Sequence, residues 1–324
     1  MKPACTDLEF INLWRQLGSP TLVAKHLSIS DRCVKTRRNS IESRYQIELP
    51  TTNNQSNLGK HSDRNPEHPG RVELSVKNGT VIIFSDAHYW PDIISPAHKA
   101  LLHFIKELQP TLVICNGDAF DGGAISRFPR IGWDEKPTVV NEIRGVTERL
   151  TEIEDLTKSK LVWTLGNHDS RYETFLAARV PEFQGVKGFT LKEHFPRWMP
   201  AWACWLNKDD PLGKTVIKHR YRGGVHATHN NTVNSGCSIV TGHLHSLKVT
   251  PFSDYNGNRF GVDTGTLADP YGPQFQDYAE DNPNNHRSGF AILTYHKGML
   301  LWPELVHVIE GTNEVEFRGK IIKV

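Results

Sequence analysis

The chain has 324 residues, which is enough for one catalytic domain and a small second domain. Its 38 lysine and arginine residues nearly balance 36 aspartate and glutamate residues, so the net charge of +2 neither requires nor excludes an acidic partner. The five cysteines lie far apart and form no CxxC pair, which argues against a disulfide framework and a structural zinc site. We find no apolar run of membrane-spanning length and no secretory signal, so we expect a cytoplasmic protein without a membrane partner.

The first 50 residues predict three short helices. Apolar residues recur at helical spacing from Leu8 to Leu17, and Gly18 follows where a left-handed cap ends a helix. Ser19-Pro20 is a typical start for a second helix, and Ser30 can cap a third. We therefore expect a small all-α domain over residues 1–50.

The third of these helices is rich in positive charge. We expect its basic side chains to point outward and to contact nucleic-acid phosphates; they are Arg32, Lys35, Arg37, Arg38 and Arg44. The pattern resembles a helix-turn-helix, because Ala24 is small at the helix crossing and Val34 would anchor the helix that reads DNA. It departs from many members of that family at Ser28, where they have glycine. The alternative is a charged helical face or a protein-docking module that never contacts DNA.

A polar tract separates this domain from the rest of the chain. Residues 51–70 contain almost no apolar side chain, and such a composition cannot offset the entropy of ordering the backbone. We expect a flexible linker over residues 51–76 and a second domain over residues 77–324.

Three apolar runs in the second domain end in polar loops. The runs and their loops are Val81–Phe84 with Asp86-Ala87-His88, Leu112–Cys115 with Gly117-Asp118, and Leu161–Leu165 with Gly166-Asn167-His168-Asp169. Because strands of α/β sheets bind ligands at their carboxyl ends, we expect these loops to lie at one rim. Apolar residues at helical spacing in residues 96–108 and 139–156 predict helices that cover the sheet.

Further strands are predicted toward the carboxyl terminus. Residues 215–219 and 238–245 are apolar runs that end in His219 and in Gly242-His243-Leu244-His245. Later strands are expected near residues 247–251, 259–262, 290–295 and 306–317. The tryptophan-rich tract 198–205 is either a lid or, as we prefer, part of the buried core.

The ordered motifs DxH, GD, GNHD, a strand-borne histidine and GHxH resemble those of the calcineurin-like metallophosphoesterase superfamily. The resemblance spans residues 77–296. It implies an α/β fold in which a β-sandwich is flanked by helices. It also implies a binuclear hydrolase in which a metal-bridging hydroxide attacks phosphorus.

The resemblance assigns roles to individual residues. Asp86, His88 and His245 would bind one metal, Asn167, His219 and His243 the other, and Asp118 would bridge them. His168 would be the catalytic histidine that protonates the leaving oxygen or stabilises the transition state. The cofactors would be two divalent ions, with manganese preferred and iron, zinc, nickel or magnesium as alternatives.

One ligand has competitors. Arg220 follows His219 where the family usually has glycine, and His226 and His229 lie close behind. We prefer His219 because it alone ends an apolar strand, as the other ligands do.

Four polar residues near the ligand loops are further candidates. Arg127 and Arg171 can bind the substrate phosphate. Asp121 can orient a ligand imidazole, and Asp169 can form hydrogen bonds around the metal loop. An ordinary exposed side chain is the alternative for Asp121 and for both arginines.

The substrate class does not follow from the fold. A DNA- or RNA-binding first domain would raise the local concentration of nucleic acid near the metals, which favours a phosphodiesterase or nuclease. This domain combination also resembles proteins of bacteriophages and prophages, which implies a bacterial or phage-infected host cytoplasm. The alternatives are a phosphomonoesterase that acts on proteins or nucleotides, and a non-catalytic DNA-binding regulator. The sequence does not indicate the oligomeric state.

Overall fold

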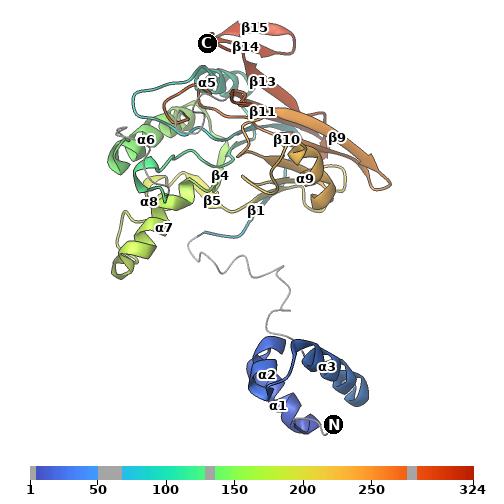
Figure 1. Cartoon of the computed structure of the whole chain (residues 1–324). Coiled ribbons are helices and arrows are strands. Elements are labelled where there is room, and N and C mark those ends of the chain that lie inside the picture. The colour runs from blue at the N-terminus through green and yellow to red at the C-terminus, as the bar shows by residue number, and fades with distance from the viewer. Residues whose placement is uncertain (1–4, 50–67, 128–135, 276–282) are drawn as a thin grey trace. The chain divides into compact units, whose positions relative to one another are not determined.

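The computed structural model describes residues 5–49, 68–127, 136–275 and 283–324. The chain divides into two compact units, Met1–Pro66 and Glu67–Val324, which we call the head and the main unit (Figure 1). Each is described by itself.

The head consists of the three helices that the sequence predicts. They are α1 (Asp7–Leu17), α2 (Pro20–Leu27) and α3 (Asp31–Tyr45). Their apolar faces share one core, in which Phe10 and Trp14 of α1 are the largest buried side chains. The helices therefore hold together by apolar burial, as expected for elements too short to be stable alone.

The turn between α2 and α3 is tight. Ser28 ends α2 with a left-handed backbone (φ 54°, ψ 41°), which costs an L-residue roughly 1–2 kcal/mol. This is the turn position at which helix-turn-helix proteins often have glycine. The hydroxyl of Thr21 donates to the Asp31 carboxylate (2.8 Å) and links the two helices.

Arg37 does not point outward as expected. Its guanidinium donates to the carbonyl oxygen of Cys5 and to Asp7 Oδ1 (3.3 Å), and it lies over the ring of Phe10. The spacing of charges along α3 could not show this, because the partners belong to α1 and the segment before it.

Two other basic residues of α3 are paired with acids of the head. Arg38 is 3.3 Å from Glu42, and Arg44 is 2.7 Å from Asp7. Two exposed cations of α3 have no carboxylate partner among the described residues; they are Arg32 and Lys35.

The main unit begins earlier in the chain than the sequence predicts. Strand β1 (Val72–Leu74) lies in the expected linker but pairs in parallel with β6 (Cys204–Leu206). The buried side chain of His68 is hydrogen-bonded to Glu173 (2.8 Å). A strand of three residues has too little alternation to be recognised in sequence. The rest of the expected linker, residues 51–67, lies outside the described residues.

The larger sheet of the main unit has nine strands within the described ranges. Their order is β15-β14-β13-β11-β2-β3-β4-β5, with β12 paired to β11. Their bounds are β2 Gly79–Phe84, β3 Leu112–Cys115, β4 Lys160–Thr164, β5 Trp198–Ala201, β11 Gly289–His296, β12 Met299–Leu300, β13 Glu304–Val308, β14 Glu314–Phe317 and β15 Lys320–Lys323. Strands β2 to β5 are parallel to one another, whereas β11 is antiparallel to β2.

The smaller sheet has six strands in the order β1-β6-β7-β8-β10-β9. The strands not yet given are β7 Thr215–Ile217, β8 Ser238–Thr241, β9 Lys248–Asp254 and β10 Gly257–Asp263. Strands β7, β8 and β10 are parallel, so the loops after them leave the sheet on the same edge.

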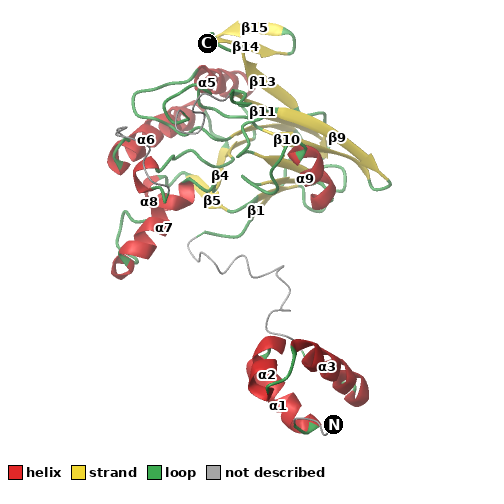
Figure 2. Ribbon diagram, viewed as in Figure 1, coloured by secondary structure: helices red, strands yellow, loops and turns green. Residues whose placement is uncertain are grey.

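The two sheets pack face to face and helices cover their outer faces (Figure 2). Alternate residues of β2 show the layers, since Val81 and Ile83 pack between the sheets while Ile82 and Phe84 pack toward the helices. The helices and 3₁₀ turns are α5 Pro96–Leu108, η2 Gly123–Ile125, α6 Val139–Leu156, α7 Asp169–Arg179, η3 Pro181–Phe183, α8 Leu191–His194 and α9 Ala227–Ser235. The expected sandwich flanked by helices is confirmed.

The tryptophan-rich tract forms β5 and β6, both buried at alternate positions, and is therefore core, as preferred from the sequence. Other elements differ from the sequence-based expectation. The strand region expected near residues 306–317 is a hairpin, β13 and β14. Helices α7 and α9 were not predicted, because neither has a strongly one-sided apolar face.

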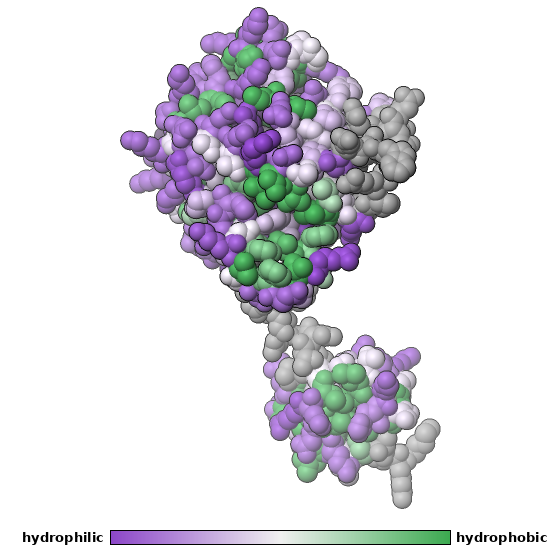
Figure 3. Space-filling model, turned by 90° about the vertical axis from the view of Figure 1, so that its left-hand side faces the viewer, coloured by the Kyte–Doolittle hydropathy of each residue, from purple (hydrophilic) through white to green (hydrophobic). Residues whose placement is uncertain are grey.

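Apolar side chains gather on the surface of the main unit that carries α6 to α8 (Figure 3). Phe175 of α7 and the following Phe183 and Val186 are among the exposed large apolar residues. No helix in the described part of the chain is long and apolar enough to cross a membrane.

Candidate metal centre

Loops from both sheets bring the predicted ligands together. The loops after β2, β3 and β4 leave the larger sheet, and those after β7 and β8 leave the smaller one. Each loop follows the carboxyl end of its strand. These loops carry all seven predicted metal ligands: Asp86, His88, Asp118, Asn167, His219, His243 and His245.

Five of these seven residues have a left-handed backbone. Their φ angles lie between 38° and 72°; they are Asp86, His88, Asp118, His243 and His245. The conformation costs an L-residue roughly 1–2 kcal/mol, so it persists only where the surrounding structure enforces it. Such strain at five ligand positions indicates a functional site.

Asp86, His88 and His245 form a first cluster, in which one donor atom from each lies within 4.8 Å of the others. The Nε2 atom of His245 is 3.0 Å from Asp86 Oδ1. Burial alone would raise the pKa of Asp86, but the imidazoles of His245 and His219 lower it to about 2. The carboxylate is therefore ionised at neutral pH, as a metal ligand must be.

Asp118, His219 and His243 form a second cluster. The Nε2 atom of His219 is 3.0 Å from Asp118 Oδ2, but the pair is not aligned as a hydrogen bond. The same Nε2 atom is 3.9 Å from Asp86 Oδ1, so the two clusters adjoin.

Three buried atoms of candidate ligands near this junction, each able to bind a metal ion, have no hydrogen-bond partner among the described residues. They are His88 Nε2, Asn167 Oδ1 and His219 Nε2. An unsatisfied buried polar atom costs about 1–3 kcal/mol, so three in one place require a common partner. Nitrogen and oxygen donors in this combination suit divalent manganese, iron or zinc. The residues therefore fit two divalent metal ions.

Hydrogen bonds on the far side of two imidazoles set their orientation. His88 Nδ1 donates to Asp121 Oδ1 (2.9 Å), and His219 Nδ1 donates to the carbonyl oxygen of Asn116 (2.8 Å). In both rings the proton is on Nδ1, which leaves the Nε2 lone pair free to bind metal. Asp121 thus lies where we expected an orienting carboxylate.

The ring of His245 has a different neighbour. Its Nδ1 atom is 3.4 Å from Nδ1 of His286, and the ring centroids are 4.4 Å apart. Sequence analysis did not identify His286, because it belongs to none of the motifs and follows no apolar strand.

The Asp169 carboxylate joins two of the ligand loops. Its Oδ2 atom accepts hydrogen bonds from the backbone N–H groups of Asp118 and Gly166 (both 2.8 Å) and from Trp163 Nε1 (2.9 Å), and Oδ1 accepts from Phe120 N–H (3.1 Å). A buried carboxylate with four donors is satisfied by the loops themselves. Asp169 therefore positions the loops and does not face the substrate.

His168 lies beside the second cluster. Its Nδ1 atom is 2.8 Å from the carbonyl oxygen of Asp121, and its Nε2 atom is 4.0 Å from Asp118 Oδ2. Burial lowers the pKa of His168, but the carboxylates of Asp118 and Asp121 outweigh burial and the net shift is upward. An imidazole with a raised pKa next to the metal ligands can donate a proton to a leaving oxygen.

One of the two predicted phosphate-binding arginines, Arg171, contacts the loop after β3 and His168. Its Nη1 donates to the carbonyl oxygen of Asp121 (2.9 Å), and its Nη2 is 3.1 Å from His168 Nε2. Arg127 is exposed and follows η2. The structure brings Arg171 to His168, the predicted catalytic histidine.

The competing histidines lie elsewhere in the described structure. His226 and His229 are exposed at the start of α9, and the ring of His229 packs against Phe252 (5.5 Å between centroids). Neither belongs to a cluster of candidate ligands in the described ranges, whereas His219 does.

Two glycines of the ligand motifs are required because side chains of candidate ligands pack directly against their Cα atoms. A Cβ atom at Gly166 would lie 2.0 Å from Asp118 Oδ1, and one at Gly117 would lie 2.4 Å from Nδ1 of the His219 ring. Gly117 also has a φ of +88°. These loops contain glycine because ligand side chains occupy the space of a Cβ atom.

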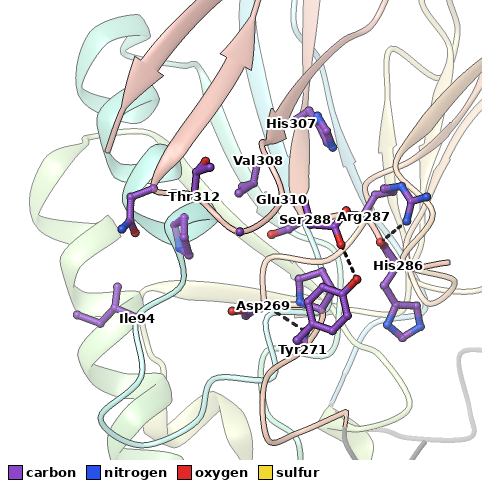
Figure 4. A pocket seen from close by; sticks show the side chains of 14 residues that line it. Ile94, Asp269, Tyr271, His286, Arg287, Ser288, His307, Val308, Glu310 and Thr312 are labelled. Atoms are coloured by element: carbon purple, nitrogen blue, oxygen red, sulfur yellow. Dashed lines mark hydrogen bonds between the residues drawn. The ribbon is translucent and has the colours of Figure 1, made fainter. Parts of the chain in front are cut away.

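Each cluster adjoins a cavity. His286, next to His245, helps to line a cavity of about 470 Å³ that also contains Tyr271 and Arg287 (Figure 4). His243 helps to line a smaller cavity of about 130 Å³. Space for chemical groups is therefore present beside both clusters.

Glu142 of α6 supports the loop after β3 from behind. Its carboxylate accepts hydrogen bonds from the N–H groups of Gly122 (2.9 Å) and Gly123 (3.1 Å). Burial and the nearby charge of Asp121 raise the pKa of Glu142 to about 7, although the two N–H donors oppose the shift. In sequence Glu142 is an ordinary helical glutamate.

Comparison with known proteins gives one family. The model of the calcineurin-like phosphoesterase family matches residues 79–304, which is more than half of the chain. No curated protein sequence matches the chain significantly.

Several solved structures resemble the chain. Vps29 from Entamoeba histolytica, complexed with zinc, has 14% identity and a TM-score of 0.41, with 75% of this chain and 98% of that chain covered. The phosphoesterase YfcE from E. coli has 17% identity and a TM-score of 0.31, with 69% and 97% covered. A dimetal phosphatase from Danio rerio has 11% identity and a TM-score of 0.33, with 76% and 98% covered.

We predict that Gly166→Ala weakens metal binding by about 10- to 100-fold, the range found when groups that position ligands are removed. The new methyl group must displace the Asp118 carboxylate, which lies 2.0 Å from its position. Titration calorimetry with Mn²⁺ measures the effect. Gly145→Ala is the control, because its Cβ would meet its nearest atom at an ordinary 3.5 Å. Equal affinities in the two variants would contradict the steric role of Gly166.

We also predict that Glu142 makes stability depend on pH. Its folded-state pKa of about 7 exceeds the ordinary 4.5, so the folded state retains the proton longer than the unfolded state. The free energy of unfolding therefore falls as pH rises from about 4.5 to about 7, by on the order of 3 kcal/mol from this group.

Urea unfolding of the wild type and Glu142→Gln between pH 4.5 and pH 8, with a chelator present, tests this prediction. The wild type should lose stability relative to the variant across that window. Glu148→Gln, an exposed change on the same helix, should give a curve parallel to the wild type. If the Glu142→Gln curve is parallel as well, the carboxyl has the same pKa in both states.

Proposed function

This chain belongs to the calcineurin-like phosphoesterase family and is a hydrolase of phosphoester bonds, and from this premise we propose that it cleaves phosphodiester bonds in nucleic acid. Asp86, His88 and His245 would hold one metal ion, Asn167, His219 and His243 would hold the second, and Asp118 would serve both. The metal ions, when bound, activate a water molecule and neutralise charge on the phosphoryl group.

The chain's own residues supply the remaining chemistry. His168 lies at the edge of the second cluster, where its imidazole, once protonated at Nε2, can pass a proton to the leaving oxygen. Arg171 lies against His168 Nε2 and can stabilise the negative charge of the phosphate at the same place. Asp121 keeps both His88 and His168 in position through one carboxylate oxygen.

The observation that favours a diester is the presence of a cavity beside each cluster. A phosphodiester has two substituents on phosphorus. The cavity lined by His286, the neighbour of His245, and the cavity lined by His243 offer space for one each. A phosphate monoester would need only one. A phosphomonoesterase that acts on proteins or nucleotides is the alternative.

The head supports a nucleic-acid substrate. The two exposed cations of α3 that have no carboxylate partner among the described residues, Arg32 and Lys35, are both in the first half of that helix. In helix-turn-helix proteins the first residues of this helix contact the bases. A head that binds nucleic acid would raise the concentration of substrate near the metal ions.

We predict that the protein with added Mn²⁺ hydrolyses bis-p-nitrophenyl phosphate and DNA, and that Asp118→Asn lowers both rates by about a thousandfold or more, because charge stabilisation by the metals is worth several kcal/mol. Parallel assays use bis-p-nitrophenyl phosphate, p-nitrophenyl phosphate, and labelled single- and double-stranded DNA. Gly145→Ala serves as an active control. Hydrolysis of the monoester alone would contradict the proposal and indicate a phosphomonoesterase.

A separate prediction concerns the head. Replacing both unpaired cations, Arg32→Gln with Lys35→Gln, should weaken binding of a DNA duplex and lower the slope of log K against log [salt] by nearly 2, about 0.9 for each lost phosphate contact. Fluorescence anisotropy at several salt concentrations measures the slope. Lys158→Gln with Lys160→Gln makes the same charge change on the exposed surface of the main unit and should leave the slope unchanged. If both pairs behave alike, α3 is not a nucleic-acid-binding helix.

A further inference from the structure

A long stretch of the main unit has no acidic residue. Between residues 211 and 253 the sequence contains no aspartate or glutamate, although the whole chain is nearly neutral. The lysine and arginine residues of this stretch are Lys214, Lys218, Arg220, Arg222 and Lys248. The stretch includes three of the candidate metal ligands, so positive charge is concentrated at the metal centre.

Three of these cations belong to one loop beside the metal centre. We call residues 218–224, which follow β7, the basic loop. Its His219 is a candidate ligand, and Arg220 and Arg222 follow directly. The His219 carbonyl oxygen accepts a hydrogen bond from Gly242 N–H (2.9 Å), which ties the basic loop to the loop that carries His243.

The basic loop is held in place by the structure around it. The buried side chain of Asn231 in α9 accepts from Arg222 N–H (3.1 Å) and donates to the Arg222 carbonyl oxygen (3.3 Å). The Lys248 ammonium donates to the carbonyl oxygen of Val225 just beyond the loop (3.0 Å). Asn231 satisfies both backbone groups of Arg222, so the backbone of the basic loop is already ordered. Binding a ligand there therefore does not cost the entropy of ordering the loop.

The arginines of the loop have no carboxylate partner in the described structure. Other arginines of the main unit do, such as Arg259 with Asp254 and Arg318 with Glu304. Both Arg220 and Arg222 instead line the cavity of about 130 Å³ that His243 also lines. This volume exceeds the roughly 30 Å³ that a water molecule occupies, so a group of several heavy atoms can enter.

An aromatic ring lies among these cations. The ring of Tyr221 is 43% exposed, with the Lys218 ammonium 5.1 Å and the Arg222 guanidinium 5.8 Å from its centre. Basic side chains interleaved with an exposed aromatic ring are typical of surfaces that bind single-stranded nucleic acid, where bases stack on the ring. The alternative is an ordinary solvated loop, but such a loop has no need of two arginines without carboxylate partners beside a candidate metal ligand.

We propose that the basic loop binds the phosphate next to the scissile phosphate of a single-stranded nucleic acid, through Arg220 and Arg222, and that Tyr221 offers its ring to a base. The inference rests on the proposed function and adds a second phosphate site to it. It gives the main unit its own contact with a polynucleotide, independent of the head. A substrate with one phosphate gains nothing from this site.

Substrates with one or two phosphates test the inference. The p-nitrophenyl esters of thymidine 5′-phosphate and thymidine 3′-phosphate are compared with the same esters carrying a second phosphate on the other hydroxyl. In the wild type the second phosphate should raise kcat/KM by about tenfold or more in one of the two series, because it adds charge-assisted hydrogen bonds that a one-phosphate substrate lacks.

The variants are chosen to separate charge from shape. In Arg220→Gln with Arg222→Gln, the ratio of kcat/KM between two-phosphate and one-phosphate substrates should fall to about one, and Arg220→Lys with Arg222→Lys should retain part of it. Arg144→Gln with Arg179→Gln removes the same charge from exposed positions of α6 and α7 and should leave the ratio unchanged. Equal loss on both substrates would overturn the inference, because the arginines would then act on the scissile phosphate.

A binding measurement keeps the test independent of turnover. With a chelator present, the affinity of the full chain for a fluorescent oligothymidylate is measured at several salt concentrations. The glutamine pair should lower the salt slope by about 1.4, or 0.7 for each contact to a single strand. If no substrate is hydrolysed but the slope falls, the proposed function fails and the phosphate site stands. If diesters are hydrolysed while the ratio and the slope are unchanged, the basic loop has no such role.

Discussion

The main unit is organised around two carboxylates, Asp86 and Asp118, that are buried at the junction of its sheets. Burying like charges together costs several kcal/mol unless each is paired and hydrogen-bonded. The structure supplies imidazoles from the smaller sheet and backbone N–H groups from neighbouring loops: His243 N–H donates to Asp86 and His168 N–H donates to Asp118. Each carboxylate keeps one oxygen directed toward the imidazoles. This arrangement gives a metal centre its negative charge without leaving that charge uncompensated.

The same constraint explains the unusual backbone of the ligand loops. Five candidate ligands adopt left-handed conformations, and motif glycines leave room where a Cβ atom would strike a ligand. The Asp169 carboxylate accepts hydrogen bonds from the backbone of both the Asp118 loop and the Gly166 loop and so holds the two loops together. The strain is tolerated because the last four residues of each strand behind these loops are buried in a closely packed core that resists shifts.

Charge is distributed unevenly in both units, although the chain as a whole is nearly neutral. In the head, acids of α1 and α3 pair with Arg37, Arg38 and Arg44, which confines the exposed unpaired cations of α3 to its first half. In the main unit, Arg220 and Arg222 lie in an acid-free stretch beside a candidate ligand and have no carboxylate partner within the described ranges. Both patterns favour a phosphate-rich substrate, and they are independent of each other.

The sequence alone determined the three head helices, the main strands and the family motifs. Those features depend on local signals: caps, apolar periodicity, and ligands placed directly after strands. Only the tertiary structure decided which side chains from distant parts of the chain come into contact. It placed His219 rather than His226 or His229 in the cluster, turned Arg37 toward Asp7, and brought His286 and Glu142 to the site. Such partners are set by packing between segments far apart in the chain, and no local pattern records them.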